Sequence, residues 1–271
     1  MYENIDEYFS GRALFGNDFG SKEIKEWFDD EKEGYADLGP KDNLSYNYGY
    51  HALNTLCGLS KVRHMHGARV LGFGAAYGDE LLPLKENISE IVVLDPSDSF
   101  VGKSHVFPNS ITWKKPDVSG DLDFPDESFD LVTSHGVLHH VPNVGHVLKE
   151  IYRCTKNGGY FLLREPVVSM GDWRKPRRGL TKRERGIPEH LLLEMCESSG
   201  FEIERKTFCM FAPYSRIVSK FGLKTPVYNS RLLTYIDLMF SKLFSFNKIY
   251  HRTSFFSKFG PACVYLVLHK K

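Results

Sequence analysis

Short apolar stretches alternate with stretches of helical spacing along this chain. The stretches predicted as strands are 68–73, 91–94, 128–134, 160–164, 201–210 and 262–269. The predicted helices are 21–32, 46–60, 79–82, 188–199, and a segment that starts at Val144 and stops at Asn157-Gly158-Gly159. Strands that alternate with helices in this way indicate an α/β fold, in which helices cover both faces of a mostly parallel sheet.

Composition narrows the class of protein. The chain has 271 residues, of which 42% are hydrophobic and 25% are charged, and this balance is typical of a globular protein. No apolar run approaches the roughly 18 residues that a membrane span needs. The acidic start has no apolar segment of a secretory signal, and the five cysteines form no CxxC pair. We therefore predict a cytoplasmic protein without disulfides and without a metal site.

The two ends of the chain differ in charge. Residues 1–45 carry 12 acidic and 5 basic side chains, a net charge of −7, whereas residues 172–271 carry 19 basic and 8 acidic side chains, a net charge of +11. The densest basic cluster runs from Arg174 to Arg185. One interpretation is a solvated loop attracted to the acidic front, and the other is a binding site for an anionic molecule.

Three successive strand ends carry candidate ligand-binding residues. Gly72, Gly74 and Gly78 form a turn after the first strand that lets the backbone approach a ligand closely. A dinucleotide fingerprint would need glycine at Tyr77, which disfavours a nicotinamide enzyme. Asp95 ends the second strand, where a carboxylate binds both hydroxyls of a ribose, although it could also cap the next helix.

The next positions extend this pattern toward a nucleoside. Pro96 follows Asp95 directly and can lie flat against a purine. Asp117 and Val118 follow a further strand end, where a carboxylate beside a backbone N–H would recognise adenine. One glycine turn and two acids at three strand ends form a more specific pattern than any one of them.

These motifs resemble one family. The stretches that carry the resemblance are Val70–Gly78, Val93–Ser97, Phe124–Val132, Val137–Pro142, Leu148–Arg153 and Lys156–Gly159, and they are similar to class I S-adenosylmethionine-dependent methyltransferases of the small-molecule type. The resemblance implies a doubly wound Rossmann-like sheet of seven strands, with the last strand antiparallel. It also implies S-adenosylmethionine as cofactor. Gly72, Gly74 and Gly78 would flank its methionine part, Asp95 its ribose, and Asp117 and Val118 its adenine. Ser134 and His135 would lie near its sulfonium.

The chain departs from the family pattern at two positions. The family usually has an acid at the place of Gly72 and a glycine at the place of Ala76. Asp79, Glu80 or an N-terminal residue could replace the acid. The departures also leave open a non-catalytic protein that keeps the cofactor fold and acts as a partner subunit.

Acceptor chemistry points to two adjacent histidines. Methyl transfer to a hydroxyl needs alignment and removal of a proton, and histidine suits the second task at neutral pH. His139 and His140 follow the strand 128–134 at the ligand edge, and Glu165, at the end of the next strand, could orient one of them. The sequence does not choose between the two histidines. Ser134-His135-Gly136-Val137 stands where methyltransferases of exocyclic base amines carry an Asn/Asp-Pro-Pro motif.

Topology gives the basic cluster and a late insertion the same location. We predict a helical, acidic extension (1–60), a cofactor-binding core (61–210), an insertion that caps the acceptor site (211–261) and a final strand (262–271). Arg174, Arg177, Arg178 and Arg183 would then bind an anionic acceptor. The apolar residues of the insertion predict a helical cap packed on the domain or on a second subunit. The alternative is an interfacial helix at a membrane.

These observations predict a methyltransferase that acts on a small polar acceptor. The favoured reaction is O-methylation of a sugar or nucleotide sugar in glycan or secondary-metabolite synthesis. A nucleic-acid (tRNA) methyltransferase is an alternative, motivated by the basic cluster, and would bind with steep salt dependence. A homodimer and a peripheral membrane contact are both compatible with the sequence.

Overall fold

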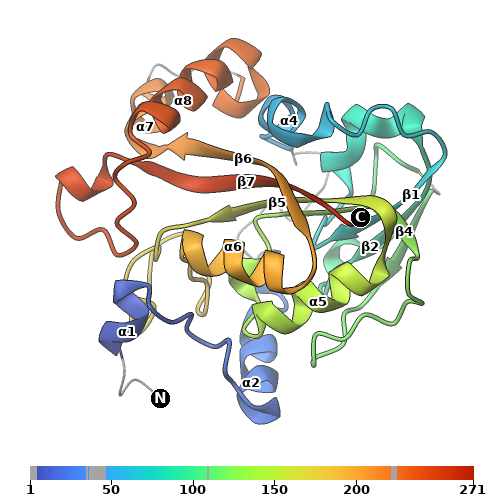
Figure 1. Ribbon diagram of the computed structural model, residues 1–271, viewed down its shortest axis with the longest axis horizontal. Coiled ribbons are helices and arrows are strands. Elements are labelled where there is room, and N and C mark those ends of the chain that lie inside the picture. The colour runs from blue at the N-terminus through green and yellow to red at the C-terminus, as the bar shows by residue number, and fades with distance from the viewer. Residues whose placement is uncertain (1–4, 35, 37–46, 109, 221–224) are drawn as a thin grey trace.

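The protein folds around one seven-stranded sheet (Figure 1). The computed structural model describes residues 5–34, 36, 47–108, 110–220 and 225–271. The strands are β1 (Ala68–Phe73), β2 (Ile88–Leu94), β3 (Ile111–Lys114), β4 (Phe129–His135), β5 (Thr155–Pro166), β6 (Glu202–Phe211) and β7 (Pro261–His269). Their order is β3-β2-β1-β4-β5-β7-β6, and β7 is antiparallel to both of its neighbours. The expected Rossmann-like arrangement with an antiparallel last strand is confirmed.

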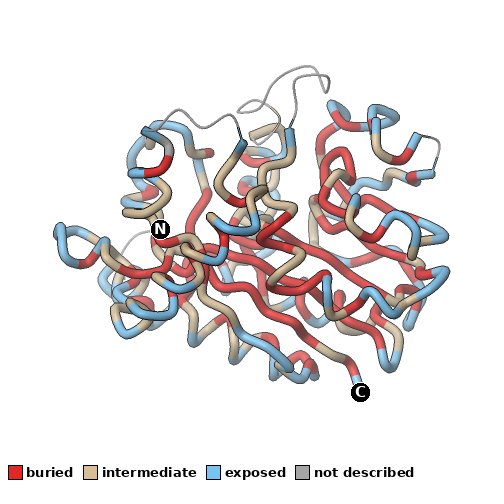
Figure 2. Tube along the Cα trace, turned by 90° about the horizontal axis from the view of Figure 1, so that it is seen from above, coloured by how far each residue is buried: buried red, intermediate tan, exposed pale blue. Residues whose placement is uncertain are grey.

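Helices cover both faces of the sheet, as Figure 1 shows. α5 (Val144–Cys154) and α6 (Glu189–Ser198) lie on one face. α4 (His51–Asn54), its π-helical continuation η1 (Thr55–Leu59) and α8 (Arg231–Leu243) lie on the other. Because successive side chains of a strand point to opposite faces, Leu71 and Val132 join the α5 core while Val70 and Leu131 join the α4 core. The central strands are therefore buried on both faces, as Figure 2 shows, which explains their continuous apolar runs. The edge strands β3 and β6 are partly exposed.

Several predicted boundaries are corrected by the structure. α5 ends at Cys154, and Asn157-Gly158-Gly159 belongs to β5 instead of stopping the helix. Gly158 has a φ of +76°, so it bends the start of the strand in a conformation that favours glycine. The predicted helix 46–60 is the shorter pair α4 and η1, and Tyr46 lies outside the described residues. The short helix predicted to open at residues 79–82 is a 3₁₀ segment, η2 (Asp79–Asn87).

The N-terminal segment and the insertion attach to the ligand edge of the sheet. α1 (Ile5–Ser10) and α2 (Ser21–Glu31) precede the core, and α7 (Ala212–Ser219), the 3₁₀ turns η5 (Val227–Asn229) and η6 (Phe256–Lys258), and α8 lie between β6 and β7. The carboxylate of Asp237 in α8 accepts hydrogen bonds from the backbone N–H groups of Met210 and Phe211, both 2.8 Å long. This buried acid ties α8 to the end of β6. Among the described residues, none of the helices has the length and apolar character that a membrane crossing requires.

Candidate active site

A cavity opens at the carboxyl ends of β1, β2, β3 and β4. Phe73, Gly74, Leu94, Pro96, Asp117, Val118 and Val137 line it from the sheet edge. Ile24, Trp27 and Phe28 of α2 line it from the N-terminal segment. The structure thus brings Gly74, Pro96, Asp117 and Val118 together, at the position where open α/β sheets bind ligands. The predominantly apolar walls suit a flat heterocycle.

The turn after β1 is shaped by backbone conformations that favour glycine. Gly74 has a φ of +69°, and a Cβ atom there would collide with the side chain of Val137. Gly78 has a φ of +78° and is the N-cap residue directly before η2. Ala76 has a φ of +48°, which puts an alanine in a conformation that is unfavourable for every residue except glycine. The turn keeps the shape that the glycine motif predicts, with strain at Ala76.

The position of Gly72 has no room for an acid. A Cβ atom at Gly72 would lie 2.6 Å from the Cβ atom of Ala75. Of the acids suggested as replacements, Glu80 is buried and accepts a hydrogen bond from Thr133, the β4 residue paired with Gly72. Asp79 has a buried oxygen, Oδ1, without a hydrogen-bond partner in the described chain. Both Asp79 and Glu80 therefore stay candidates for the role of the acid that the family usually has at the place of Gly72.

Asp95 lies beneath the cavity wall at the end of β2. Its Oδ2 accepts a hydrogen bond from the N–H of Ala76 (3.3 Å), and its Oδ1 accepts one from the N–H of Ser97 (3.0 Å). Burial raises the pKa of Asp95 to about 6, and the nearby carboxylate of Glu33 adds to this effect. The carboxylate joins the glycine turn to the loop after β2.

Ser134 and His135, predicted near the sulfonium, point to opposite faces of β4. Ser134 Oγ is buried and has no hydrogen-bond partner among the described residues. His135 Nε2 lies 3.0 Å from the Tyr265 hydroxyl, and His135 Nδ1 lies 3.3 Å from a carboxylate oxygen of Glu80. The amide of Asn54 connects the same ring to Arg164 of β5. His135 is thus part of a buried polar network on the α4 side of the sheet.

Glu165 holds the loop that carries the two histidines. Its carboxylate is fully buried and accepts hydrogen bonds from the backbone N–H groups of Val137 (2.9 Å), Leu138 (2.8 Å) and His139 (3.3 Å). It also accepts a 2.7 Å hydrogen bond from His139 Nδ1. The structure therefore places Glu165 against His139, as the strand-end argument expects of an acid that orients a histidine.

The second nitrogen of His139 faces another acid. His139 Nε2 lies 3.4 Å from Glu184 Oε1. Burial alone would lower the pKa of His139, but the carboxylates of Glu165 and Glu184 outweigh it and raise the pKa to about 9. His139 is consequently an imidazolium at neutral pH, with both N–H groups engaged.

His140 differs from His139 in its position at the cavity and in the direction of its pKa shift. It lines the cavity, and its Nδ1 lies 2.8 Å from Glu31 Oε2 of α2. Burial and the adjacent charge of His139 lower the pKa of His140. When Nδ1 donates to Glu31, Nε2 is left as a hydrogen-bond acceptor. Glu31 is held in turn by the hydroxyl of Thr181 and by the N–H of Arg183.

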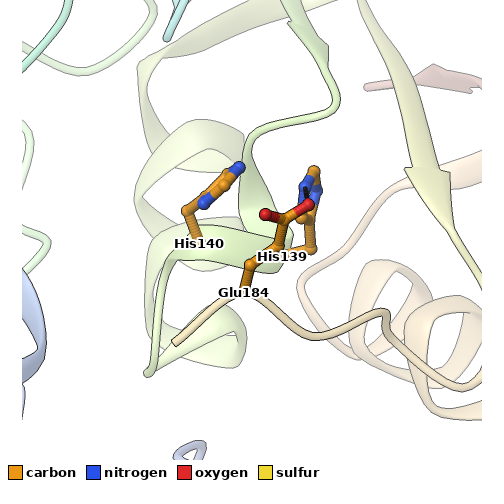
Figure 3. A group of neighbouring side chains, drawn as sticks. All are labelled: His139, His140 and Glu184. Atoms are coloured by element: carbon orange, nitrogen blue, oxygen red, sulfur yellow. Dashed lines mark ion pairs between the residues drawn. The ribbon is translucent and has the colours of Figure 1, made fainter. Parts of the chain in front are cut away.

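His139, His140 and Glu184 form a compact group of possible metal ligands (Figure 3). One ligand atom from each lies within 4.8 Å of the others. The Nδ1 atoms of both histidines have partners within the protein, which are Glu165 for His139 and Glu31 and Thr181 for His140. We therefore describe it as a proton-sharing cluster, and the predicted lack of a metal site stays a prediction.

Three of the four predicted substrate-binding arginines have partners within the protein. Arg174 pairs with Asp172 at 2.8 Å, and Arg183 pairs with Asp30 of α2 at 2.7 Å. Arg177 donates to the backbone carbonyls of Met170, Thr181 and Lys182, and Arg178 is exposed. The attraction between the basic cluster and the acidic N-terminal segment is thus seen directly in α2. Binding of an anionic acceptor by these residues stays a prediction.

Sequence reasoning missed the contributions of α2 and of Arg185. Trp27 is fully buried and donates from its indole nitrogen to the His140 carbonyl at 2.6 Å. Glu31 contacts His140 across 109 positions of sequence. The one available signal was the amphipathic pattern of 21–32, which predicted a helix but gave no indication of its neighbours.

Comparisons with known proteins define the class of this domain. Residues 71–163 match the family model described as a methyltransferase domain. The chain is similar to a ubiquinone/menaquinone biosynthesis C-methyltransferase of Xanthomonas campestris, with 32% identity over 118 residues, covering 41% of this chain and 47% of that protein. The chain thus contains a methyltransferase domain, and its resemblance to the class I S-adenosylmethionine-dependent enzymes is confirmed.

Solved structures support the same fold. An S-adenosylmethionine dependent methyltransferase from Mesorhizobium loti covers 75% of this chain and 91% of its own, with a TM-score of 0.50 and 19% identity. The superposition with the cyclase SpnF covers 93% of this chain and 97% of that chain, with a TM-score of 0.56 and 16% identity. Because a cyclase has the same fold, the fold alone does not determine the reaction. The chain spans about half the length of the curated relative above.

Proposed function

We propose that this protein is an S-adenosylmethionine-dependent methyltransferase that methylates a hydroxyl of a small polar molecule, with His140 as general base. The observation that carries the proposal is the pairing of His140 with Glu31 at the wall of the cavity. A carbon or nitrogen nucleophile that is already electron-rich has less need of a base in this position. A sugar or a related polyol is the acceptor class that we favour.

The cavity residues fit the cofactor. Pro96 and Val118 offer flat apolar surface for adenine, and Asp95 and Asp117 offer carboxylates for the hydroxyls and the amine of adenosine. The glycine turn at Gly74 leaves space that a side chain would fill. When bound, S-adenosylmethionine supplies a methyl group on a positively charged sulfur.

His140 would accept the proton of the acceptor hydroxyl at Nε2. Its lowered pKa keeps it neutral at pH 7, and Glu31 would stabilise the imidazolium that forms. His139 does not suit this role, because its raised pKa of about 9 means that it already carries a proton. It instead supports the loop from which His140 projects.

The helix α2 would exclude water from the reaction. Trp27 and Phe28 line the cavity opposite the sheet edge, and Trp27 is also fixed to the His140 carbonyl. A closed apolar wall strengthens electrostatic interactions inside the site and keeps water from competing for the base.

A tracer assay tests the proposal. Transfer of a labelled methyl group would be measured over a panel of sugars, nucleotide sugars, phenols and tRNA, with cofactor affinity measured by calorimetry. We expect transfer to a hydroxyl acceptor, and we expect His140→Gln to lower kcat by about 10²–10⁴-fold without weakening cofactor binding. His146→Gln, which changes an exposed histidine paired with Asp121, is the matched control.

The outcomes separate the alternatives. Full activity in His140→Gln would refute the assignment of the base while leaving the methyltransferase in place. Transfer to tRNA alone would support the nucleic-acid alternative. Cofactor binding without transfer to any acceptor would favour the non-catalytic partner subunit that Gly72 and Ala76 raised.

A further inference from the structure

The insertion between β6 and β7 exposes an unusual number of large apolar side chains. Those on α8 are Leu232, Tyr235, Met239 and Leu243, with exposed fractions between 57% and 69%. The segment that follows adds Phe246, Ile249, Phe255 and Phe256, with exposed fractions between 50% and 80%. We call these eight side chains the insertion surface. Exposed apolar residues in such a group mark an interaction site.

The α8 members share one face of the helix. Their spacings are three, four and four residues, which places them in a single row along the helix. The opposite face holds Thr234, Asp237 and Ser241, which are buried toward the protein. The apolar row therefore points away from the fold and has no role in its core.

The second part of the insertion surface adjoins the end of α8. The ring of Phe244 contacts those of Phe246 and Phe259, with centroids 6.1 and 6.4 Å apart. Phe255 contacts Phe259 at 5.1 Å. The side chain of Asn247 donates to the carbonyl of Phe256 at 2.9 Å, which closes the loop. These contacts join the two parts at the C-terminal end of α8.

The charged residues of the insertion are almost all basic. Residues 212–260 contain eight lysines and arginines and a single acid, Asp237. Asp237 is buried and accepts hydrogen bonds from the backbone at the end of β6. Arg231, Lys242 and Lys258 are exposed and have no ion pair among the described residues. Lys248 pairs with Glu189 outside the insertion.

We propose that the insertion surface docks the protein on an anionic lipid bilayer. The apolar row would enter the headgroup region, and Arg231, Lys242 and Lys258 would contact lipid phosphates, since long basic side chains extend along apolar surface to reach them. A symmetric contact with a second copy would face the same cationic surface with itself, so charge disfavours that occupant.

The position of the insertion surface determines which part of the protein would lie near the bilayer. The insertion starts where β6 ends and returns where β7 begins, which is the edge of the sheet where the cavity opens. Docking would therefore bring the β6–β7 end of this edge near the bilayer. The proposal goes beyond methyl transfer and does not depend on the identity of the acceptor.

Vesicle flotation of the full chain tests this inference. The probes are vesicles of phosphatidylcholine alone and of phosphatidylcholine with phosphatidylglycerol, at low and high salt. We expect binding to the anionic vesicles that weakens with salt. Met239→Glu/Leu243→Glu and Arg231→Glu/Lys242→Glu should each weaken that binding by about tenfold or more.

Controls separate a local effect from unfolding. Leu82→Glu changes a side chain that is 42% exposed on η2, and Lys149→Glu changes an exposed lysine of α5, so both should bind vesicles as the unchanged protein does. Circular dichroism and cofactor affinity check that every variant folds. Failure to bind anionic vesicles, or binding by both double variants as strong as that of the unchanged protein, would overturn the proposal. A dimer in light scattering that the same double variants dissociate would identify a second copy as the occupant instead.

Discussion

Glu165 and Arg185 hold the same loop from opposite sides. Glu165 accepts from the N–H groups that begin the segment 137–142, and Arg185 donates to the carbonyls of Leu138, His139, Val141 and Pro142. Both side chains are fully buried. Each charge is thus compensated largely through the backbone of the loop that positions His140.

Removing one of these two buried charges should lower the free energy of unfolding. Arg185→Met would remove the guanidinium that donates to these four carbonyls and to that of Phe15, and would leave Glu165 with less compensating charge, so we expect the free energy of unfolding to fall by about 3–5 kcal/mol. Arg174→Met removes an arginine from a surface pair and should change it by less than about 1 kcal/mol. Urea unfolding of both variants measures the difference. Equal effects would show that the loop does not depend on Arg185.

The two adjacent histidines should titrate far apart. We expect His139 to keep its proton up to a pKa of about 9, while the pKa of His140 lies below its usual value. Both pKa values are measured by NMR from the ring Cε1–H resonances between pH 5 and 10. The variants His139→Gln and His140→Gln assign each resonance to its histidine. Because the pKa of His139 is raised on folding, its contribution to stability should be present below about pH 6.5 and lost as the pH rises through 9. Titration of both rings near 6.5 would contradict the proton-sharing cluster.

Cofactor affinity should weaken in mild acid. Asp95 has a pKa raised to about 6, and a protonated carboxyl accepts hydrogen bonds from ribose hydroxyls less well than a carboxylate. We expect S-adenosylmethionine to bind about tenfold more weakly at pH 5 than at pH 7.5, by calorimetry. Asp95→Asn should bind weakly at every pH, whereas Asp98→Asn, at an exposed pair with Lys115, should retain the pH dependence. An affinity independent of pH would place the ribose elsewhere.

Substitutions at Ala76 and Gly74 in the glycine turn should change the stability of the protein in opposite directions. Ala76→Gly relieves a φ of +48°, so we expect unchanged stability or a gain of up to about 1 kcal/mol. Gly74→Ala imposes both the strained φ and a collision with Val137, and should cost about 1–3 kcal/mol and reduce cofactor affinity. Thermal unfolding and calorimetry measure both changes. A loss of stability in Ala76→Gly would mean that the alanine methyl group makes a needed contact.

Local pattern was sufficient for most of the sheet and for part of the site. Val70 to Phe73 and Ile91 to Leu94 read as strands because their apolar runs are buried on both faces. The proximity of Glu165 and His139 followed from the rule that neighbouring parallel strands end at one edge. The prediction that Gly158 helps to stop the helix was wrong, because a glycine with positive φ bends the start of a strand as readily as it ends a helix.

The rest of the site depends on contacts that no local pattern encodes. Glu31 meets His140 only because α2 packs across the sheet edge, and Arg185 acts through backbone carbonyls, which carry no side-chain signature. The basic cluster suggested an anionic ligand, but Arg183 and Arg174 bind acids of this same chain. Charge counts cannot distinguish an internal partner from an external one.

The helix α2 makes two properties of the cavity inseparable. It supplies Trp27, which walls the cavity, and Glu31, which fixes the tautomer of His140. If α2 leaves the sheet edge, the cavity opens to water and the histidine loses its orienting acid in the same motion. An open protein would therefore lack the acid that orients the proposed base, so the proposed proton transfer would be possible only while α2 closes the cavity.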